Sequence, residues 1–310
     1  HTGSGARSSS SAFPTAELGV FVSPVAGSGA LHVDEVVAGG PFDNSRTKLQ
    51  KGSLITAIDG EKLEAGKDYF PLLNDKVGKR LLVSFRTASG EQVDEVIRPI
   101  SSSALNDLLY KRWVKQRAEE VERVSKGTLG YVHIPSMGDP SFRTVYSDVM
   151  GKYYQKKGIV IDIRYNGGGR LHEDIEAFFT GKHYADQVVR DRQYSEMSSR
   201  RWNRPSVLVT CEADYSNAHG TPWVYQHLKV GKVVGMPVAG TMTSVNWVTL
   251  LDPSVYFGIP AVGFRLFDGR YLENTQMEPD VVVPLDPTKV LQGVDTQIEK
   301  AVEVLRAETK

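Results

Sequence analysis

Ser216 is the side chain in this sequence that is best placed to act as a nucleophile. It follows the apolar run 206–211 and precedes a helical pattern at 219–228, which predicts a turn from a strand into a helix. A second apolar run, 158–163, leads into three consecutive glycines at 167–169. Because ligands gather at the carboxyl ends of strands in α/β sheets, we expect the two loops to face one another. Acyl transfer needs such a serine, together with backbone donors that can approach a ligand closely.

Other interpretations of these residues stay open at this stage. Ser216 could instead be the N-cap of the helix that follows, because serine commonly caps a helix that begins just after it. The three glycines could instead form a simple turn. Ordering three consecutive glycines costs more conformational entropy than a simple turn requires. Judged from the residues alone, the base for Ser216 would be His219, which lies three residues later on the same helical face.

The composition narrows the class of protein. The chain has 310 residues and 40% hydrophobic content, for which two domains with ordinary cores are the default. Lys plus Arg and Asp plus Glu both number 37, so no net charge favours nucleic acid. No apolar run approaches the roughly 20 residues that span a bilayer, and we expect no membrane insertion.

Cofactors are also not expected. The single cysteine, Cys211, excludes an internal disulfide and a cysteine-based zinc site, and its apolar surroundings predict an inert buried thiol. No histidine pair has the spacing of a zinc peptidase. The first twelve residues contain neither an initiator methionine nor the apolar core of a signal peptide. A chain that opens at His1 is expected to be a fragment or a processed form, which leaves a cytoplasmic or a periplasmic location open.

The pattern along the chain predicts four segments. Residues 1–16 are a flexible lead-in, 17–100 form a small β-rich domain, 101–126 form an amphipathic connecting helix, and 127–310 form an α/β domain of alternating strands and helices. Within the last segment we expect strands at 129–134, 158–163, 207–210, 233–235 and 261–265, and helices at 142–156, 172–180 and 219–228. The arginine-rich run 190–204 is expected to be a long surface loop.

The β-rich segment resembles a PDZ domain. The resemblance rests on Leu18-Gly19-Val20-Phe21, on Gly40-Pro41, and on the run 49–60 that ends in an Asp-Gly turn. It implies that the first of these motifs binds the terminal carboxylate of a peptide through consecutive backbone N–H groups, while the peptide adds to the sheet edge as a strand. A role as a spacer or lid is the alternative.

Several motifs in order resemble the tricorn-like proteases, within the wider family of tail-specific or C-terminal-processing serine peptidases. They are residues 127–137, the Asp162-Ile-Arg-Tyr-Asn-Gly-Gly-Gly169 loop, Ser216, the run 229–235, and Leu272-Glu273-Asn274 leading to Glu278-Pro-Asp280. The resemblance covers almost the whole chain. It implies a crotonase-like αββ sheet with helices, with the PDZ-like domain preceding the catalytic core.

The resemblance also implies roles for individual residues. Ser216 matches the nucleophile, and the N–H of Asn217 is the first expected oxyanion donor. The second donor is expected from the glycine loop, at Gly167 or Gly168. Glu273 matches the acid that orients the base.

The base implied by the resemblance is His1. In the family a serine precedes this histidine as a fourth member of the site, and the present chain begins one residue after that serine. His219 is kept as the rival base, and His172 is expected to line the cleft as a substrate contact. Thr243 and Trp247, in a polar loop, are candidate residues of the substrate pocket.

These residues together predict a serine endopeptidase that cleaves peptides or unfolded polypeptides through an acyl-enzyme. A noncatalytic PDZ-type peptide-binding scaffold is the alternative. A nucleotide binder is disfavoured, because no Lys followed by Ser or Thr comes after the glycines. Self-association into a homo-oligomer is left open.

Overall fold

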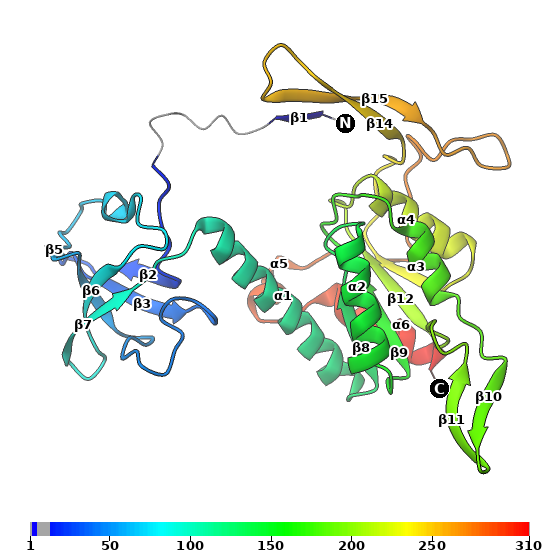
Figure 1. The fold of residues 1–310 in the computed structure, drawn as a ribbon, viewed down its shortest axis with the longest axis horizontal. Coiled ribbons are helices and arrows are strands. Elements are labelled where there is room, and N and C mark those ends of the chain that lie inside the picture. Colours follow the sequence, from blue (N-terminus) through cyan, green and yellow to red (C-terminus); the bar gives the residue numbers. More distant parts are fainter. Residues whose placement is uncertain (1, 5–12, 310) are drawn as a thin grey trace. The chain divides into compact units, whose positions relative to one another are not determined.

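The computed structural model describes residues 2–4 and 13–309 and divides into two compact units. The larger unit holds residues 1–6 and 114–310, and the smaller unit holds residues 7–113. Helix α1 (Ser102–Ser125) covers the expected connecting segment and contributes to both units. All of the strands that carry the predicted active-site loops belong to the larger unit (Figure 1).

A five-stranded parallel sheet forms the centre of the larger unit, in the order β16-β13-β12-β9-β8. Its strands are β8 (Leu129–His133), β9 (Gly158–Asp162), β12 (Ser206–Thr210), β13 (Lys232–Gly235) and β16 (Val281–Val282). Every residue of β9 and β12 is buried, which is why these strands appear in the sequence as continuous apolar runs. The strands expected at 129–134, 158–163, 207–210 and 233–235 are confirmed to within a residue.

Helices cover both faces of this sheet. One core contains alternate strand residues such as Ile159 and Ile161 and packs against α2 (Asp139–Ser147), α3 (His172–Phe179) and α4 (Asn217–His227). The other contains Val160 and Val209 and packs against the second half of α1 and against α6 (Thr296–Glu308). Because successive side chains of a strand point to opposite faces, one strand supplies both cores. The expected α/β architecture is therefore confirmed (Figure 1). A π-helical turn, η2 (Asp148–Lys152), extends α2, and the short helix α5 (Pro287–Leu291) precedes α6.

The strand expected at 261–265 is wrong. Strand β15 (Val255–Val262) ends at Val262 and pairs antiparallel with β14 (Ser244–Thr249) and with β1 (Thr2–Ser4), outside the parallel sheet. Gly258 and Pro260 hide this strand in the sequence, because both residues usually interrupt strands. The missing N–H of Pro260 is tolerated, since β1 pairs only with residues 255–257 in the described part of the chain.

The long loop expected at 190–204 is also wrong. Most of its first half belongs to a hairpin of β10 (Ala185–Val189) and β11 (Arg192–Met197). The turn consists of Arg190 and Asp191, both at positive φ (49° and 60°). Hairpin turns with two positive φ values normally contain glycine or asparagine, so the sequence gives little sign of this one.

The smaller unit contains an antiparallel sheet in the order β2-β3-β4-β6-β7, with the short β5 (Glu61–Lys62) beside β4. Its strands are β2 (Val20–Pro24), β3 (Leu31–Val36), β4 (Leu54–Ile58), β6 (Leu81–Arg86) and β7 (Gln92–Ile97), and a 3₁₀ turn, η1, spans Phe70–Leu73. Strand β2 is an edge strand, and the apolar core includes Leu18. In the described ranges of both units, no helix is long and apolar enough to cross a membrane.

Candidate active site

The two predicted loops lie side by side because β9 and β12 are neighbours in the parallel sheet, with Asp162 paired to Val209. The chain leaves β9 into the glycine loop and leaves β12 into the turn that carries Ser216. A side chain added at Gly168 would have its Cβ 2.6 Å from the Ser216 Cβ and 3.1 Å from the Ser216 Oγ. The glycine loop therefore approaches the serine more closely than any other residue type would allow.

Ser216 has an unusual backbone conformation, with φ 58° and ψ −120°. A positive φ is rare for a residue with a side chain and persists only where the surroundings hold it. The Ser216 N–H donates to Thr241 Oγ1 at 2.8 Å, which fixes the turn from one side. The Ser216 hydroxyl makes no capping hydrogen bond to α4, although Ser216 occupies the N-cap position. The N-cap interpretation therefore does not explain this side chain.

The three glycines differ in what they require. Gly169 has φ 138°, and a Cβ there would be 2.1 Å from the Met137 carbonyl oxygen, while Gly167 has nothing within 4 Å. The Gly168 N–H donates to Asn166 Oδ1 at 2.8 Å, so in this conformation it is already used. The hydrogen bonds of the described residues leave the N–H groups of Gly167 and Gly169 without an acceptor.

Asn217 joins the glycine loop to the serine turn through its side chain. Its Oδ1 accepts hydrogen bonds from the N–H groups of Leu171 and His172, at 2.9 and 3.1 Å. Its own N–H is the first of helix α4 and has no acceptor among the residues described. An N–H at the start of a helix is suited to stabilise a negative charge.

Glu273 is half-buried and follows Leu272 in the segment after β15. Its Oε2 accepts a hydrogen bond from the Thr243 N–H at 2.8 Å, and no described residue donates to its Oε1. Burial raises the pKa of Tyr215, and the Glu273 charge raises it further. Burial lowers the pKa of His219, and the Glu273 charge offsets part of that effect. Glu273 therefore lies near the serine turn with one carboxylate oxygen uncommitted.

His219 is fully buried, and its recorded hydrogen bond goes from Nε2 to the Thr275 carbonyl at 2.9 Å. A carbonyl only accepts, so Nε2 carries a proton. The buried Nδ1 has no hydrogen-bond partner among the described residues, which favours the neutral ring because a second buried N–H would lack an acceptor. Burial lowers the pKa of His219, in the same direction. This histidine ties α4 to the segment that carries Glu273, and no hydrogen bond joins it to the Ser216 hydroxyl.

His172 lies at the start of α3, where its Nδ1 accepts from Asn217 Nδ2 at 2.8 Å. Burial lowers the pKa of His172, and its ring packs edge-on against Phe264 with centroids 6.0 Å apart. His172 contributes to the cavity beside Ser216, and its role as a substrate contact stays a prediction.

A cavity of about 370 Å³ opens beside Ser216. It is lined by Gly169, Arg170, His172, Glu173, Ser216, Asn217, Met242, Ser244, Val262 and Phe264. A larger cavity of about 830 Å³ shares His172, Met242 and Phe264 with it and includes Trp223, Leu266 and Phe267. The nucleophile candidate therefore faces a space large enough for part of a peptide, with a mostly apolar extension.

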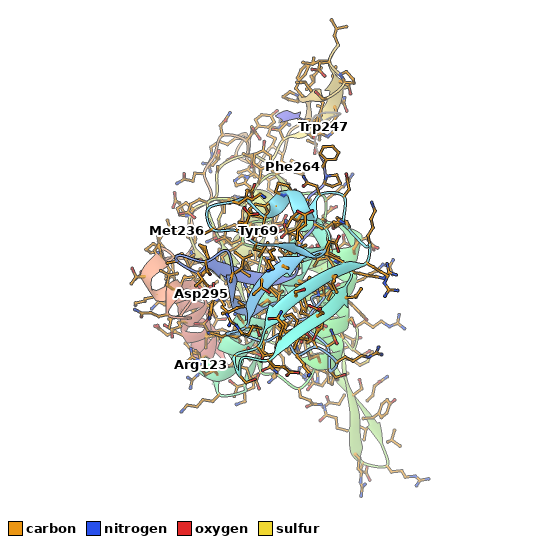
Figure 2. All side chains as sticks on the ribbon, turned by 90° about the vertical axis from the view of Figure 1, so that its left-hand side faces the viewer. Tyr69, Arg123, Met236, Trp247, Phe264 and Asp295 are labelled. Carbon is orange, nitrogen blue, oxygen red and sulfur yellow. The ribbon has the colours of Figure 1, made fainter. Side chains whose placement is uncertain are left out.

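Of the two candidate pocket residues, neither lines these cavities. Thr243 lies between the lining residues Met242 and Ser244 and contacts Glu273 through its N–H. Trp247 lies on β14 (Figure 2). It is 55% exposed and packs edge-on against Tyr256. His1, the expected base, lies outside the described residues.

Leu18, Gly19, Val20 and Phe21 belong to the smaller unit, at the start of the edge strand β2. Gly19 has φ 73°, and a Cβ there would be 2.5 Å from Pro41 Cδ, so the motif requires glycine at this position. Leu18 is buried in the core and Phe21 is exposed, beneath the Arg112 guanidinium at 5.6 Å from the ring centroid.

Sequence reasoning missed Asp214, Asn166 and Thr241. The Asp214 carboxylate accepts from the Cys211 N–H at 3.0 Å and the Asn166 N–H at 3.3 Å. Burial raises the pKa of Asp214 to about 8 and that of the Cys211 thiol to about 12, which agrees with an inert cysteine. Small polar residues in loops are too common for sequence alone to identify these. The described residues contain no cluster of three or more His, Cys, Asp or Glu side chains that could hold a metal ion.

Comparison with known proteins identifies the class. The model of Peptidase family S41 matches residues 128–283, half of the chain, and this stretch contains the glycine loop, Ser216 and Glu273. The chain therefore belongs to peptidase family S41 and is, by class, a serine peptidase.

Within that family the chain is tricorn-like. It is 27% identical to the Tricorn protease of Thermoplasma acidophilum, over 84% of this chain and 24% of that protein. It is 26% identical to the Tricorn protease homolog of Saccharolobus solfataricus, over 85% of this chain and 24% of that protein. The chain thus spans about a quarter of the length of these relatives. Its fold is similar to that in the crystal structure of the tricorn protease, with a TM-score of 0.80 and 24% identity over 96% of this chain and 29% of that one.

Proposed function

We propose that this chain hydrolyses peptide bonds through an acyl-enzyme in which Ser216 is the nucleophile. The observation that carries the proposal is the Ser216 turn, where a strained serine lies between a glycine loop and the start of a helix that its hydroxyl does not cap. Strain of this kind is found where a side chain is held for chemistry. The cavity beside it supports peptides or unfolded polypeptides as substrates.

The oxyanion donors follow from which backbone N–H groups are uncommitted. Asn217 remains the first donor, as expected from the sequence. For the second we favour Gly169 over Gly167 and Gly168, because Gly169 lines the cavity with Ser216 and its N–H has no acceptor in the described parts of the chain. The Gly168 carbonyl accepts from the Met137 N–H at 2.9 Å. In a trans peptide the following N–H points the opposite way, so that of Gly169 faces away from Met137.

In the proposed reaction, the Ser216 hydroxyl loses its proton to the base as Oγ attacks the carbonyl carbon of the substrate. The carbonyl oxygen gains the negative charge and is stabilised by the Asn217 and Gly169 N–H groups. The base then gives its proton to the leaving amine as the C–N bond breaks. Water, activated by the same base, releases the acyl group and regenerates Ser216.

We propose His1 as the base and Glu273 as the acid that orients it. The second role is supported by Oε1 of Glu273, to which no described residue donates a hydrogen bond. For the first, β1 runs antiparallel to β15 with Thr2 at its end nearer to Val262, and Val262 lines the cavity. Phe257, the partner of Thr2, lies five residues from Val262, about 17 Å of strand.

A fluorophosphonate probe followed by intact-mass measurement tests these assignments. We expect one adduct on the 310-residue chain that is lost in Ser216→Ala and His1→Ala and retained in His219→Gln, whose amide can still donate to the Thr275 carbonyl. An adduct that survives in Ser216→Ala would refute the nucleophile, and one that depends on His219 but not on His1 would move the base.

For the smaller unit, we propose a PDZ-like domain at about residues 17–100 that binds peptide carboxyl termini at Leu18–Phe21, ahead of a crotonase-like catalytic domain at 127–310. The edge position of β2 supports it, as do the Leu18 and Gly19 N–H groups, which lack acceptors among the residues described. Fluorescence anisotropy with a peptide bearing a free carboxyl terminus and with its amidated form tests it. Equal affinity for both would refute carboxylate recognition.

A further inference from the structure

Asn166 lies in the glycine loop, between β9 and the three glycines, and is fully buried. Its side chain makes two hydrogen bonds, from Nδ2 to the Ile134 carbonyl at 2.7 Å and to Oδ1 from the Gly168 N–H at 2.8 Å. Its carbonyl accepts from the Tyr215 N–H at 2.9 Å. Its N–H donates within the loop, to Ile163, and to the Asp214 carboxylate at 3.3 Å. This single residue therefore connects the segments that follow β8, β9 and β12.

The first consequence concerns the orientation of the Gly168–Gly169 peptide. Gly168 and Gly169 have φ of 96° and 138°, values that residues with a side chain rarely adopt. Because glycine has no Cβ, the backbone of such a loop can adopt many conformations. The Asn166 Oδ1 holds the Gly168 N–H, and the Met137 N–H holds the Gly168 carbonyl. With both sides of Gly168 fixed, the Gly169 N–H is left pointing away from Met137.

The second consequence concerns the nucleophile. Tyr215 immediately precedes Ser216, and its N–H is bonded to the Asn166 carbonyl. Asn166 therefore hydrogen-bonds both to Tyr215, which precedes the nucleophile, and to Gly168, which precedes the proposed donor. An oxyanion site works only if donor and nucleophile keep a fixed separation as charge develops.

We propose that Asn166 is a positioning residue of the active site, which holds the Gly169 N–H in register with Ser216 before substrate binds. This inference rests on the proposed function. The group itself is buried and touches no substrate, so it acts by limiting the conformations of the loop. Loss of its side chain leaves the serine and its base in place and removes the preorganisation of one oxyanion donor.

The test compares Asn166→Ala with Ser206→Ala in the 310-residue chain. Ser206 is also buried on this sheet and its hydroxyl is hydrogen-bonded to the Tyr225 hydroxyl at 2.6 Å, but it lies at the opposite end of β12 from Ser216. The measurements are kcat and KM for a fluorogenic tripeptide amide, the inhibition constant of the matching tripeptide aldehyde, and the thermal midpoint. The aldehyde adds to the serine and forms an oxyanion, so its affinity reports on the donors.

For Asn166→Ala we expect kcat to fall by about 10²- to 10³-fold with KM changed less than about threefold. The aldehyde inhibition constant should rise by the same factor as kcat/KM falls. Ser206→Ala should lower the thermal midpoint and leave both kinetic quantities near those of the unchanged chain. Asn166→Asp, which keeps an acceptor for the Gly168 N–H, should retain more activity than Asn166→Ala, and it serves if the alanine variant does not fold.

Several outcomes overturn the inference. Turnover that requires Ser216 but survives in both Asn166 variants, or a loss no larger than that of Ser206→Ala, refutes the positioning role alone. A fall in kcat with no change in aldehyde affinity refutes it as well. An unchanged chain without Ser216-dependent turnover refutes the proposed function, and this inference with it.

Discussion

At the scale of single residues, Ser216 combines a strained backbone with a hydroxyl that does not cap the helix it precedes. A positive φ costs a residue with a Cβ about 1 to 3 kcal/mol, and glycine avoids most of that cost. We therefore expect Ser216→Gly to be more stable than Ser216→Ala by about 1 kcal/mol, although both lose the nucleophile. Urea unfolding of the two variants measures the difference. If the glycine variant is the less stable one, the turn is not strained in solution.

Asp214 makes the free energy of unfolding of the chain depend on pH. Burial, with the charge of Asp162, raises the pKa of Asp214 to about 8, while the N–H groups of Cys211 and Asn166 lower it. The folded chain then binds this proton more tightly than the unfolded chain, whose carboxyl has a pKa near 3.8. The contribution to stability is therefore fully present below about pH 4, falls as the pH rises, and is lost above about pH 8.

Asp214→Asn should remove this dependence, because the amide stays uncharged. We expect the free energy of unfolding of the variant to gain on that of the unchanged chain between pH 5 and 8, by at most about 1.4 kcal/mol per pH unit. Urea unfolding at each pH measures it. Glu212→Gln removes an exposed acid two residues away and is the control. Parallel profiles for Asp214→Asn and the unchanged chain would show that Asp214 is ionised throughout.

At the scale of elements, the glycine loop and the serine turn could be predicted because β9 and β12 are fully buried and so form uninterrupted apolar runs. The two loops lie side by side because β9 and β12 are neighbours in the sheet. This was predictable because the loops that follow parallel strands lie at the same edge of a sheet. The hydrogen bonds that fix the loops were not predictable. Asn166, Asp214 and Thr241 are ordinary loop residues until folding brings them to their partners.

The loop itself supplies an internal comparison. Gly168→Ala would place a methyl group 2.6 Å from the Ser216 Cβ, whereas Gly167→Ala meets nothing within 4 Å and has no positive φ. We expect Gly168→Ala to reduce kcat/KM at least about 100-fold, since small displacements of a reacting group are costly. Gly167→Ala should stay within about threefold. Hydrolysis of a fluorogenic peptide measures both, and equal effects would mean that the loop does not approach Ser216 as described.

At the scale of the whole molecule, sequence reasoning separated a β-rich segment from an α/β segment, and the two compact units divide within the connecting helix. It missed the antiparallel hairpins of the larger unit, because Arg190-Asp191 and the interruptions at Gly258 and Pro260 do not resemble hairpin signals. Sequence reasoning also did not predict the hydrogen bond between Arg164 and Asp295, which lie 131 positions apart in the chain.

Arg164 is the centre of a network of buried hydrogen bonds. It is 1% exposed and bonds to Asp162, to Asp295 at 2.9 Å, and to Gln297 at 2.9 Å. Asp295 (labelled in Figure 2) caps helix α6. Its N–H donates to Glu120 of α1 at 2.8 Å. Although burial opposes it, the Arg164 guanidinium holds the pKa of Asp162 below its ordinary value. The end of β9 is thereby joined to both helices on that face of the sheet.

Removing the cation should therefore destabilise the larger unit as a whole. Arg164→Met removes the guanidinium from two buried carboxylates, and we expect a loss of about 3 to 5 kcal/mol in the free energy of unfolding. Asp162 then keeps only neutral donors such as the Tyr131 hydroxyl at 2.9 Å, while Asp295 keeps its ion pair with Arg117 at 3.4 Å. Lys300→Met breaks an exposed ion pair with Glu303 on α6 and should cost less than about 1 kcal/mol. Urea unfolding followed by circular dichroism measures both. A loss below about 1 kcal/mol for Arg164→Met would mean that the helices are held by their apolar cores alone.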